Sequence, residues 1–222
     1  MLLLMLFALP PNYPYHTVRT APFHPRIHSF GNVGWLGKLH AEQANTFTSL
    51  IDIVAYKGTN LRETIAERLR DETNASQVVE LGCGVGTLTR SLVARGFEVT
   101  AVDTSAEMIE VASRENNATF LVQNAVDTET RNADIVVACM LFHELPKQAQ
   151  VEILEAIDAP EIWIIDIATN YTPSPAMLMG EPYLIEYLYE FNSTVTDFAA
   201  AAGRTLATEE IVPGHVTLWR FS

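Results

Sequence analysis

The stretch that decides the fold is Val78-Val79-Glu80-Leu81-Gly82-Cys83-Gly84-Val85-Gly86-Thr87, in which a short apolar run leads straight into three glycines. Glycine permits a sharp turn with positive φ, and it removes side chains where a ligand must touch the backbone. A helical pattern over residues 88–94 follows at once. This order of strand, glycine loop and helix predicts a ligand site at the end of a buried strand.

An acid lies at the distance from this loop that a nucleoside site requires. Asp103 closes the next apolar run, 21 residues after Gly82, where a carboxylate on the neighbouring strand can accept hydrogen bonds from both ribose hydroxyls. The glycine spacing is G-x-G-x-G, whereas dinucleotide sites usually have G-x-G-x-x-G. Glu80, just before the loop, suits a ligand with a cationic end. A nicotinamide-dependent reductase is therefore disfavoured.

Strand and helix patterns alternate along the chain. This rhythm predicts a doubly wound α/β fold with a seven-stranded, mostly parallel sheet. Runs at 208–212 and 215–221, separated by Pro213-Gly214, predict a terminal antiparallel hairpin. Buried strands are expected at 78–81, 99–102, 120–122, 135–138 and 162–165, and helices at 41–56, 60–74, 88–94, 105–115, 146–157, 181–191 and 194–202.

Local signals mark several of these helix ends. Capping boxes are predicted from Asn60 to Glu63 and from Thr104 to Glu107, where an N-cap side chain is followed three residues later by a glutamate. A proline-rich loop is expected at 172–175, after the fifth strand.

The E-L-G-C-G-x-G core and the acid after the second strand resemble the class I S-adenosylmethionine-dependent methyltransferases, over roughly residues 78–166. The resemblance implies a Rossmann-like fold and S-adenosyl-L-methionine as cofactor. Asn124 stands where the family often has an acid that holds the adenine amino group; a turn asparagine, with Asp127 as the competing acid, is the alternative. The residues expected at the cofactor are Glu80, Gly82, Cys83, Gly84, Gly86, Asp103, Thr104, Met108, Asn124, Ala125 and Cys139.

Composition limits the partners and the compartment. The chain of 222 residues has a formal charge of −13 and a pI near 4.8, so it lacks the basic surface that nucleic acid requires. The apolar run at 1–9 is far shorter than the roughly 20 residues of a membrane span. Two cysteines are too few for a disulfide framework. We expect a cytoplasmic protein without membrane or nucleic-acid partners, with organelle import left open and the oligomeric state undetermined.

The acceptor site is expected beyond the carboxyl ends of strands 4 and 5. His143 is the candidate catalytic acid or base, because its ordinary pKa lies near neutrality; alternatively, His143 and Glu144 only cap a helix or line the cofactor pocket. The histidine-rich N-terminal segment lacks metal-ligand spacing, so no metal site is predicted. Residues proposed to contact the acceptor are Tyr15, His28, Trp35, His40, His143, Tyr183 and Tyr187.

The predicted organisation is an N-terminal helical and aromatic cap over residues 1–75, followed by a cofactor-binding domain over 76–222. The predicted activity is transfer of the cofactor's methyl group to a small-molecule acceptor, by in-line displacement in a closed pocket. No N-P-P-Y or D-P-P-Y tetrapeptide follows the fourth strand, which disfavours amide and adenine nitrogens as acceptors. The alternative is a non-catalytic module that binds the cofactor to regulate a partner.

Overall fold

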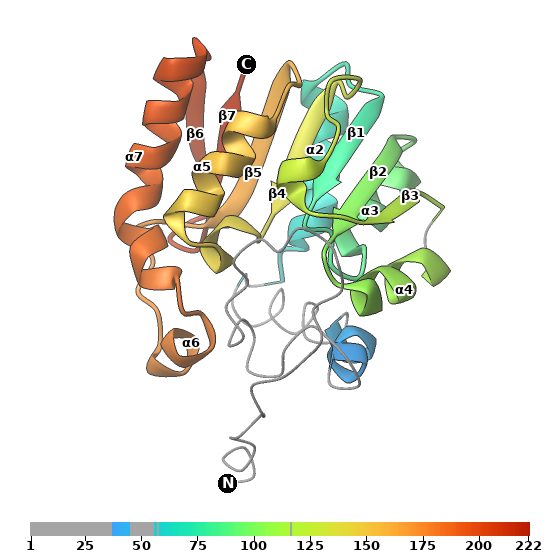
Figure 1. The fold of residues 1–222 in the computed structure, drawn as a ribbon, viewed down its shortest axis with the longest axis horizontal. Helices are drawn as coiled ribbons and strands as arrows, with labels where there is room; N and C mark the ends of the chain where they lie inside the picture. Colours follow the sequence, from blue (N-terminus) through green and yellow to red (C-terminus); the bar gives the residue numbers. More distant parts are fainter. Residues whose placement is uncertain (1–36, 45–55, 57, 116) are drawn as a thin grey trace, which may run out of the picture.

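The computed structural model describes residues 37–44, 56, 58–115 and 117–222 (Figure 1). Most of the predicted N-terminal cap, including Tyr15, His28 and Trp35, lies outside the described residues. The predicted helix at 41–56 is described only in its first part, where a helix covers 37–44 and therefore begins earlier than expected.

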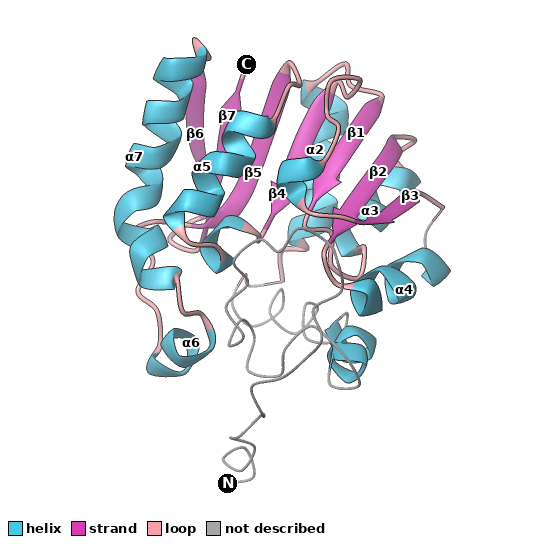
Figure 2. Ribbon diagram, viewed as in Figure 1, coloured by secondary structure: helices cyan, strands magenta, loops and turns pink. Residues whose placement is uncertain are grey.

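A seven-stranded sheet forms the centre of the molecule (Figure 2). Its strands are β1 (Gln77–Leu81), β2 (Glu98–Asp103), β3 (Thr119–Val122), β4 (Ile135–Cys139), β5 (Glu161–Ile167), β6 (Leu206–Val212) and β7 (Val216–Phe221). Their order is β3-β2-β1-β4-β5-β7-β6. The pairs among β1 to β5 are parallel, whereas β6 and β7 form an antiparallel hairpin and β7 pairs antiparallel with β5. This arrangement confirms the predicted fold class.

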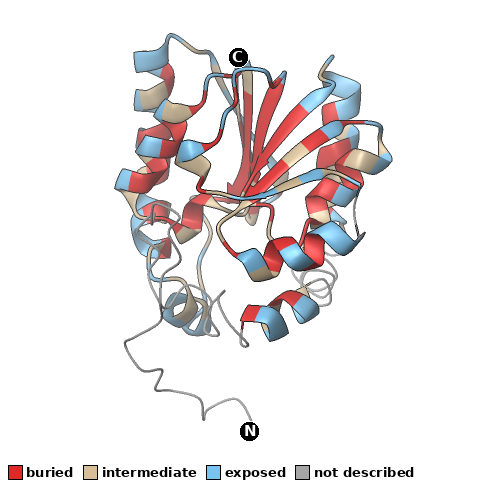
Figure 3. Ribbon diagram, turned by 45° about the vertical axis from the view of Figure 1, so that its right-hand side comes forward, coloured by how far each residue is buried: buried red, intermediate tan, exposed pale blue. Residues whose placement is uncertain are grey.

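Helices cover both faces of the sheet, as the nearly continuous apolar strands require. They are α2 (Leu61–Glu72), α3 (Thr87–Ala94), α4 (Ala106–Glu115), α5 (Lys147–Ala156), α6 (Pro175–Gly180) and α7 (Leu184–Ala202), with 3₁₀ turns η1 (Ala125–Asp127) and η2 (Phe142–Glu144). One core, with Phe142, Tyr187 and Trp219, joins α5 and α7 to the sheet. A second core around Trp163 joins α2, α3 and α4 to it. Figure 3 shows buried positions along both layers.

The helix α2 belongs to the layer that covers the sheet. Its residues Leu61, Ile65 and Leu69 are fully buried and take part in the second core. The sequence suggested that this helix is part of the N-terminal cap, yet its apolar stripe packs with the sheet. The division at residues 75–76 stays a prediction, and α2 does not pack as a separate layer.

At the start of α2 the N-cap of the predicted capping box is present, but the Glu63 side chain makes a different contact. The Asn60 side chain accepts a hydrogen bond from the backbone N–H of Glu63 at 3.2 Å, as an N-cap residue should. The Glu63 carboxylate turns instead toward α3, where it accepts hydrogen bonds from Ser91 and Arg95. The predicted capping box is therefore an N-cap combined with a contact between helices.

Two local predictions are wrong, and one short helix was not predicted. Residues 181–191 and 194–202 contribute to one helix, α7, because Ser193 and Thr194 donate their hydroxyls back to the Glu190 carbonyl rather than breaking the helix. The proline-rich loop leads into the short helix α6, capped by Ser174. At the start of α4, the Ser105 side chain accepts the hydrogen bond from the helix backbone that the sequence assigned to Thr104.

The helix over 37–44 packs against α4 and the glycine loop. Ala41 is buried in a small cluster with Val85, Met108 and Val111. Ion pairs from Lys38 to Glu110 and from Arg114 to Glu42 join the same two helices. Among the residues that the structure describes, no helix combines the length and the apolar character that a membrane span requires.

Candidate cofactor site

The glycine loop between β1 and α3 has the backbone conformation that its sequence predicts. Gly82, Gly84 and Gly86 all have positive φ, at 70°, 52° and 73°. At Gly82 space is also limiting, because an added Cβ would lie 2.7 Å from the Leu141 Cδ1 atom. The turn after β4 therefore approaches the glycine loop closely, and a side chain at Gly82 would push the two apart.

Asp103, at the end of β2, is hydrogen-bonded to the glycine loop. One carboxylate oxygen accepts a hydrogen bond from the Gly84 N–H at 2.9 Å, and the other accepts from the Ser105 N–H at 2.8 Å. Burial raises the pKa of Asp103, and these backbone donors oppose the rise. Each carboxylate oxygen can accept more than one hydrogen bond. The carboxylate can therefore bind a hydroxyl pair while it holds the loop.

A cavity of about 560 Å³ opens beside this loop, at the carboxyl ends of the strands, and its volume is typical of small-molecule sites. Of the residues predicted at the cofactor, Gly86 alone does not line the cavity; it is the N-cap of α3. The predicted residues that line it are Glu80, Gly82, Cys83, Gly84, Asp103, Thr104, Met108, Asn124, Ala125 and Cys139.

Asn124 has the local role that the turn alternative predicts. Its side-chain oxygen accepts a hydrogen bond from the Val126 N–H at 3.1 Å and caps η1. The side chain is buried and lines the cavity, and the exposed Asp127 lines it too. The amide oxygen has a second lone pair that can accept from a ligand amine. The structure brings both candidate adenine contacts to one wall of the cavity.

The two cysteines lie at the ends of neighbouring strands of the sheet. Cys83 follows β1 and Cys139 ends β4, and β1 and β4 are paired in parallel. Neither cysteine is part of a disulfide, and both residues line the cavity. Burial raises the pKa of Cys83 far above its ordinary value, which suits an inert apolar residue rather than a nucleophile.

Glu80 is a buried acid at the base of the cavity. The residue is 2% exposed, and its carboxylate accepts a hydrogen bond from the Thr89 hydroxyl at 2.6 Å. Burial raises the pKa of Glu80 to about 8, although Thr89 and the charge of Arg62 oppose the rise. In the absence of a cationic ligand the folded protein therefore holds Glu80 protonated at neutral pH.

This raised pKa predicts how stability depends on pH. The folded state binds more protons than the unfolded state between the ordinary pKa of a glutamate, 4.5, and about 8, so stability falls as pH rises across this window and then levels off. Glu80→Gln stays neutral at every pH and keeps an acceptor for Thr89. We expect Glu80→Gln to be more stable than the wild type at about pH 9, by a few kcal/mol.

Urea unfolding of both proteins at about pH 5, 7 and 9, values that span this window, measures the difference. The exposed Glu155, changed to Gln in the same way, is the matched control and should leave the pH slope unchanged. If the free energy of unfolding changes with pH in the same way for the wild type and for Glu80→Gln, burial does not raise the pKa of Glu80.

A buried histidine–aspartate pair lies behind the cavity wall. The His143 Nδ1 atom is 2.6 Å from the Asp166 Oδ1 atom. The His143 side chain is 7% exposed and that of Asp166 is fully buried. Burial alone would lower the pKa of His143, but the charges of Asp166, Glu144 and Glu181 outweigh burial and raise it to about 9.

His143 therefore carries a proton at neutral pH, and its surroundings do not support a general base that works near neutrality. His143 also does not line the cavity, whereas its neighbour Glu144 does. Asp166, which holds His143 in place, is a residue of this region that sequence reasoning missed. The sequence contained a signal for it, since Asp166 is an acid near the end of the apolar strand β5. A charged residue in a buried strand requires a partner, which could have been sought.

The residues predicted to contact an acceptor lie in different places. His40 lines the cavity from the helix over 37–44. Tyr183 is half-buried at the start of α7 and outside the cavity lining. Tyr187 is fully buried, and its hydroxyl donates to the Ile167 carbonyl at 2.6 Å. Tyr187 is thus a core residue, contrary to the prediction, because α7 turns this position toward the sheet.

The turn between β4 and η2 is strained beside the cavity. Met140 has a φ of 58°, a conformation that residues other than glycine rarely adopt. Its N–H donates to the Ile165 carbonyl at 2.8 Å, which holds the turn on β5. Met140 and Leu141 line the cavity next to the glycine loop. Strain of this kind is often found at functional sites, and the sequence carried no signal for it.

Known proteins match this chain over its central part. Residues 78–159 match a family described as a methyltransferase domain. Trans-aconitate 2-methyltransferase of Mycobacterium tuberculosis is 34% identical over 120 residues, which are 49% of this chain and 45% of the relative. Magnesium-protoporphyrin O-methyltransferase of Rhodobacter capsulatus is 29% identical over 99 residues, 41% of this chain and 44% of the relative. The chain thus spans less than half the length of each relative.

Solved structures share the fold. Magnesium protoporphyrin IX methyltransferase of Synechocystis PCC 6803, solved with bound SAM, superposes with a TM-score of 0.54 at 15% identity, covering 86% of this chain and 85% of that one. The plantazolicin methyltransferase BpumL, in complex with a triazolic desmethylPZN analog and SAH, superposes with a TM-score of 0.58 at 14% identity, covering 84% of this chain and 90% of that one.

The sheet order, the glycine loop and Asp103 define the Rossmann-like fold of class I S-adenosylmethionine-dependent methyltransferases. Residues 78–159, which match the methyltransferase domain family, contain both the glycine loop and Asp103.

Proposed function

We propose that this protein transfers a methyl group from S-adenosyl-L-methionine to a small-molecule acceptor. The observation that carries the proposal is the contact between Asp103 and Gly84, which joins a carboxylate and an open glycine backbone on one wall of the cavity. The relatives named above act, by their names, on small molecules.

The residues around the cavity suit the parts of this cofactor. Asp103 would bind the ribose hydroxyls, and Asn124 or Asp127 the adenine amino group. The glycine loop would lie along the methionine part, near the acid Glu80. When bound, the cofactor supplies an activated methyl group and its own leaving group, so the chain chiefly aligns the acceptor and excludes water.

The acceptor would enter on the side of the cavity formed by the turn after β4. Met140, Leu141 and Glu144 line this side, and His40 lies on the helix over 37–44. The catalytic role of His143 stays a prediction, and its raised pKa favours holding a charge over accepting a proton at neutral pH. An acceptor atom that is already unprotonated, such as a carboxylate oxygen or a free amine, needs no base for attack on a sulfonium, whereas a hydroxyl or an ammonium group must lose a proton.

Cofactor affinity is expected to depend on Asp103. Asp103→Ala removes a charged acceptor, and we expect S-adenosylhomocysteine to bind about 10- to 150-fold more weakly, which corresponds to about 1.5–3 kcal/mol. Isothermal titration calorimetry measures the change, with the exposed Asp71→Ala as a matched control. NAD should give no heat of binding. Tight NAD binding, or unchanged affinity in Asp103→Ala, would contradict the proposed site.

Turnover is tested with cofactor that carries a labelled methyl group. The protein is incubated with this cofactor and a metabolite extract, and a labelled small product both establishes transfer and identifies the acceptor. Binding of S-adenosylhomocysteine without any labelled product would favour a non-catalytic regulatory module instead.

We place this activity in the cytoplasm, because neither cysteine is part of a disulfide and reducing compartments keep cysteines as thiols. The charge of −13 argues against nucleic acid as the acceptor, since a phosphate backbone is bound by basic surfaces.

A further inference from the structure

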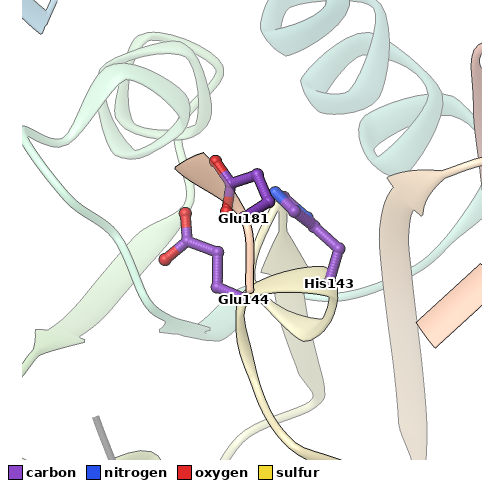
Figure 4. Close-up of side chains that lie close together, drawn as sticks. All are labelled: His143, Glu144 and Glu181. Carbon is purple, nitrogen blue, oxygen red and sulfur yellow. The ribbon is translucent and has the colours of Figure 1, made fainter. Parts of the chain in front are cut away.

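We propose that His143, Glu144 and Glu181 form a binding site for a divalent first-row metal ion at the edge of the cavity. One ligand atom from each of the three side chains can be chosen so that all lie within 4.8 Å of one another. Figure 4 shows the two carboxylates and the nitrogen-bearing end of the imidazole converging on one region. A small inward movement of the side chains would bring these atoms to metal-bonding distance.

Two separate parts of the chain build this cluster. His143 and Glu144 belong to η2, directly after the strained turn that ends β4. Glu181 is the C-cap of α6, and its N–H donates to the Met177 carbonyl at 2.9 Å. Both backbone segments are therefore held in place independently of any ion.

The imidazole is oriented from behind by Asp166. This carboxylate accepts hydrogen bonds from the N–H groups of Phe142 and Ile167, both at 2.7 Å, in addition to its contact with the His143 Nδ1 atom. With Nδ1 held in this way, the Nε2 atom is the one left to face the carboxylates. A carboxylate behind a histidine is the usual outer partner of a metal ligand, since it fixes the ring.

The burial and orientation of His143 do not depend on the two glutamates. His143 is 6% exposed, and Tyr187 packs edge-on against its ring, with the centroids 6.2 Å apart. The ring cannot turn away into solvent without breaking its contact with Asp166. A buried, oriented imidazole directed at two carboxylates is a prepared ligand set rather than a group of surface acids.

The charges and donor atoms indicate which ion would bind. Asp166, Glu144 and Glu181 surround one imidazole, and a divalent cation would neutralise this excess of negative charge in place of the imidazole proton. One nitrogen and two carboxylate oxygens suit Zn²⁺ or Mn²⁺ better than Ca²⁺, which prefers six to eight oxygens. Glu144 also lines the cavity, so the other coordination positions would be available there to water or to an oxygen of the acceptor.

This proposal departs from the absence of a metal site that the sequence predicted. The sequence drew attention to the N-terminal histidines, whereas these ligands come from two segments that are 37 residues apart at their nearest. Only the packing of α6 and η2 at the end of the sheet brings them together.

The test is calorimetric titration of the metal-free full-length protein with ZnCl₂ and with MnCl₂, without cofactor. We expect one equivalent of metal to bind, and Glu181→Gln and Glu144→Gln each to weaken binding at least about 10-fold. Glu155→Gln, on the exposed face of α5, is the matched control and should bind like the wild type. Circular dichroism melts of all variants verify that each one is folded.

Cobalt provides a readout of the ligands themselves. Co²⁺ added to the metal-free protein should give a visible absorption band that is lost in Glu181→Gln and retained in Glu155→Gln. Absence of binding up to about 1 mM metal, or binding that is unchanged in both glutamine variants, would overturn the proposal. Because no cofactor is present, either result leaves the test of cofactor binding at Asp103 unaffected.

Discussion

Replacing Asp166 with alanine is expected to destabilise the protein by about 3–5 kcal/mol, the cost typical of breaking a buried charged network. Asp166 is fully buried in β5 and accepts hydrogen bonds from the N–H groups of Phe142, His143 and Ile167. Alanine would leave these donors and the His143 ring without their acceptor. Urea unfolding, followed by far-UV circular dichroism, measures the loss.

Asp166→Asn separates the hydrogen bonds from the charge. It keeps the size and one carbonyl acceptor, so we expect a smaller loss of stability than in Asp166→Ala. The exposed Asp71→Ala should change the free energy of unfolding by less than about 0.5 kcal/mol. If Asp166→Ala is as stable as Asp71→Ala, then Asp166 is not the structural support of the turn after β4.

The glycine loop and the sheet could be predicted from the sequence because their signals are local. The apolar run before Gly82 must be buried on both faces, and the three glycines permit the positive φ angles that the structure contains. Asp103 could be placed by its distance along the chain from Gly82, since β1 and β2 are adjacent parallel strands. Each of these inferences depends only on residues within one element or on two strands that are adjacent in the sheet.

The opposite side of the cavity could not be predicted in the same way. The contact of Leu141 with Gly82, the pairing of His143 with Asp166, and the approach of Glu181 all depend on how distant segments pack. Tyr187 was misplaced because the apolar stripe of α7 is broad, and sequence periodicity alone does not show which tyrosine faces the sheet.

The two sides of the cavity differ in how they are held. On the cofactor side, backbone hydrogen bonds to Asp103 fix the glycine loop. On the proposed acceptor side, Asp166 fixes the turn that carries Glu144. Substitution of Asp103 should therefore act first on cofactor affinity, whereas substitution of Asp166 should act on stability and on the shape of the acceptor side.

Deleting residues 1–36 is expected to lower turnover about 100-fold or more while cofactor affinity stays within about 1 kcal/mol. The aromatic residues of this segment are predicted to cover the acceptor side and exclude water. The helix over 37–44, which stays in the shortened protein, reaches the cavity with His40 and Ala44. The glycine loop and Asp103 are untouched by the deletion, so their contacts with the cofactor remain.

The measurement compares full-length and shortened protein in methyl transfer from labelled cofactor and in calorimetric titration with S-adenosylhomocysteine. An unchanged cooperative thermal melt is the control for folding. Weakened cofactor binding would place the segment over the cofactor rather than over the acceptor. If the shortened protein folds and transfers methyl groups at the full rate, residues 1–36 do not shape the acceptor site, and the segments that remain, among them the turn after β4 and the helix over 37–44, are sufficient to enclose the acceptor.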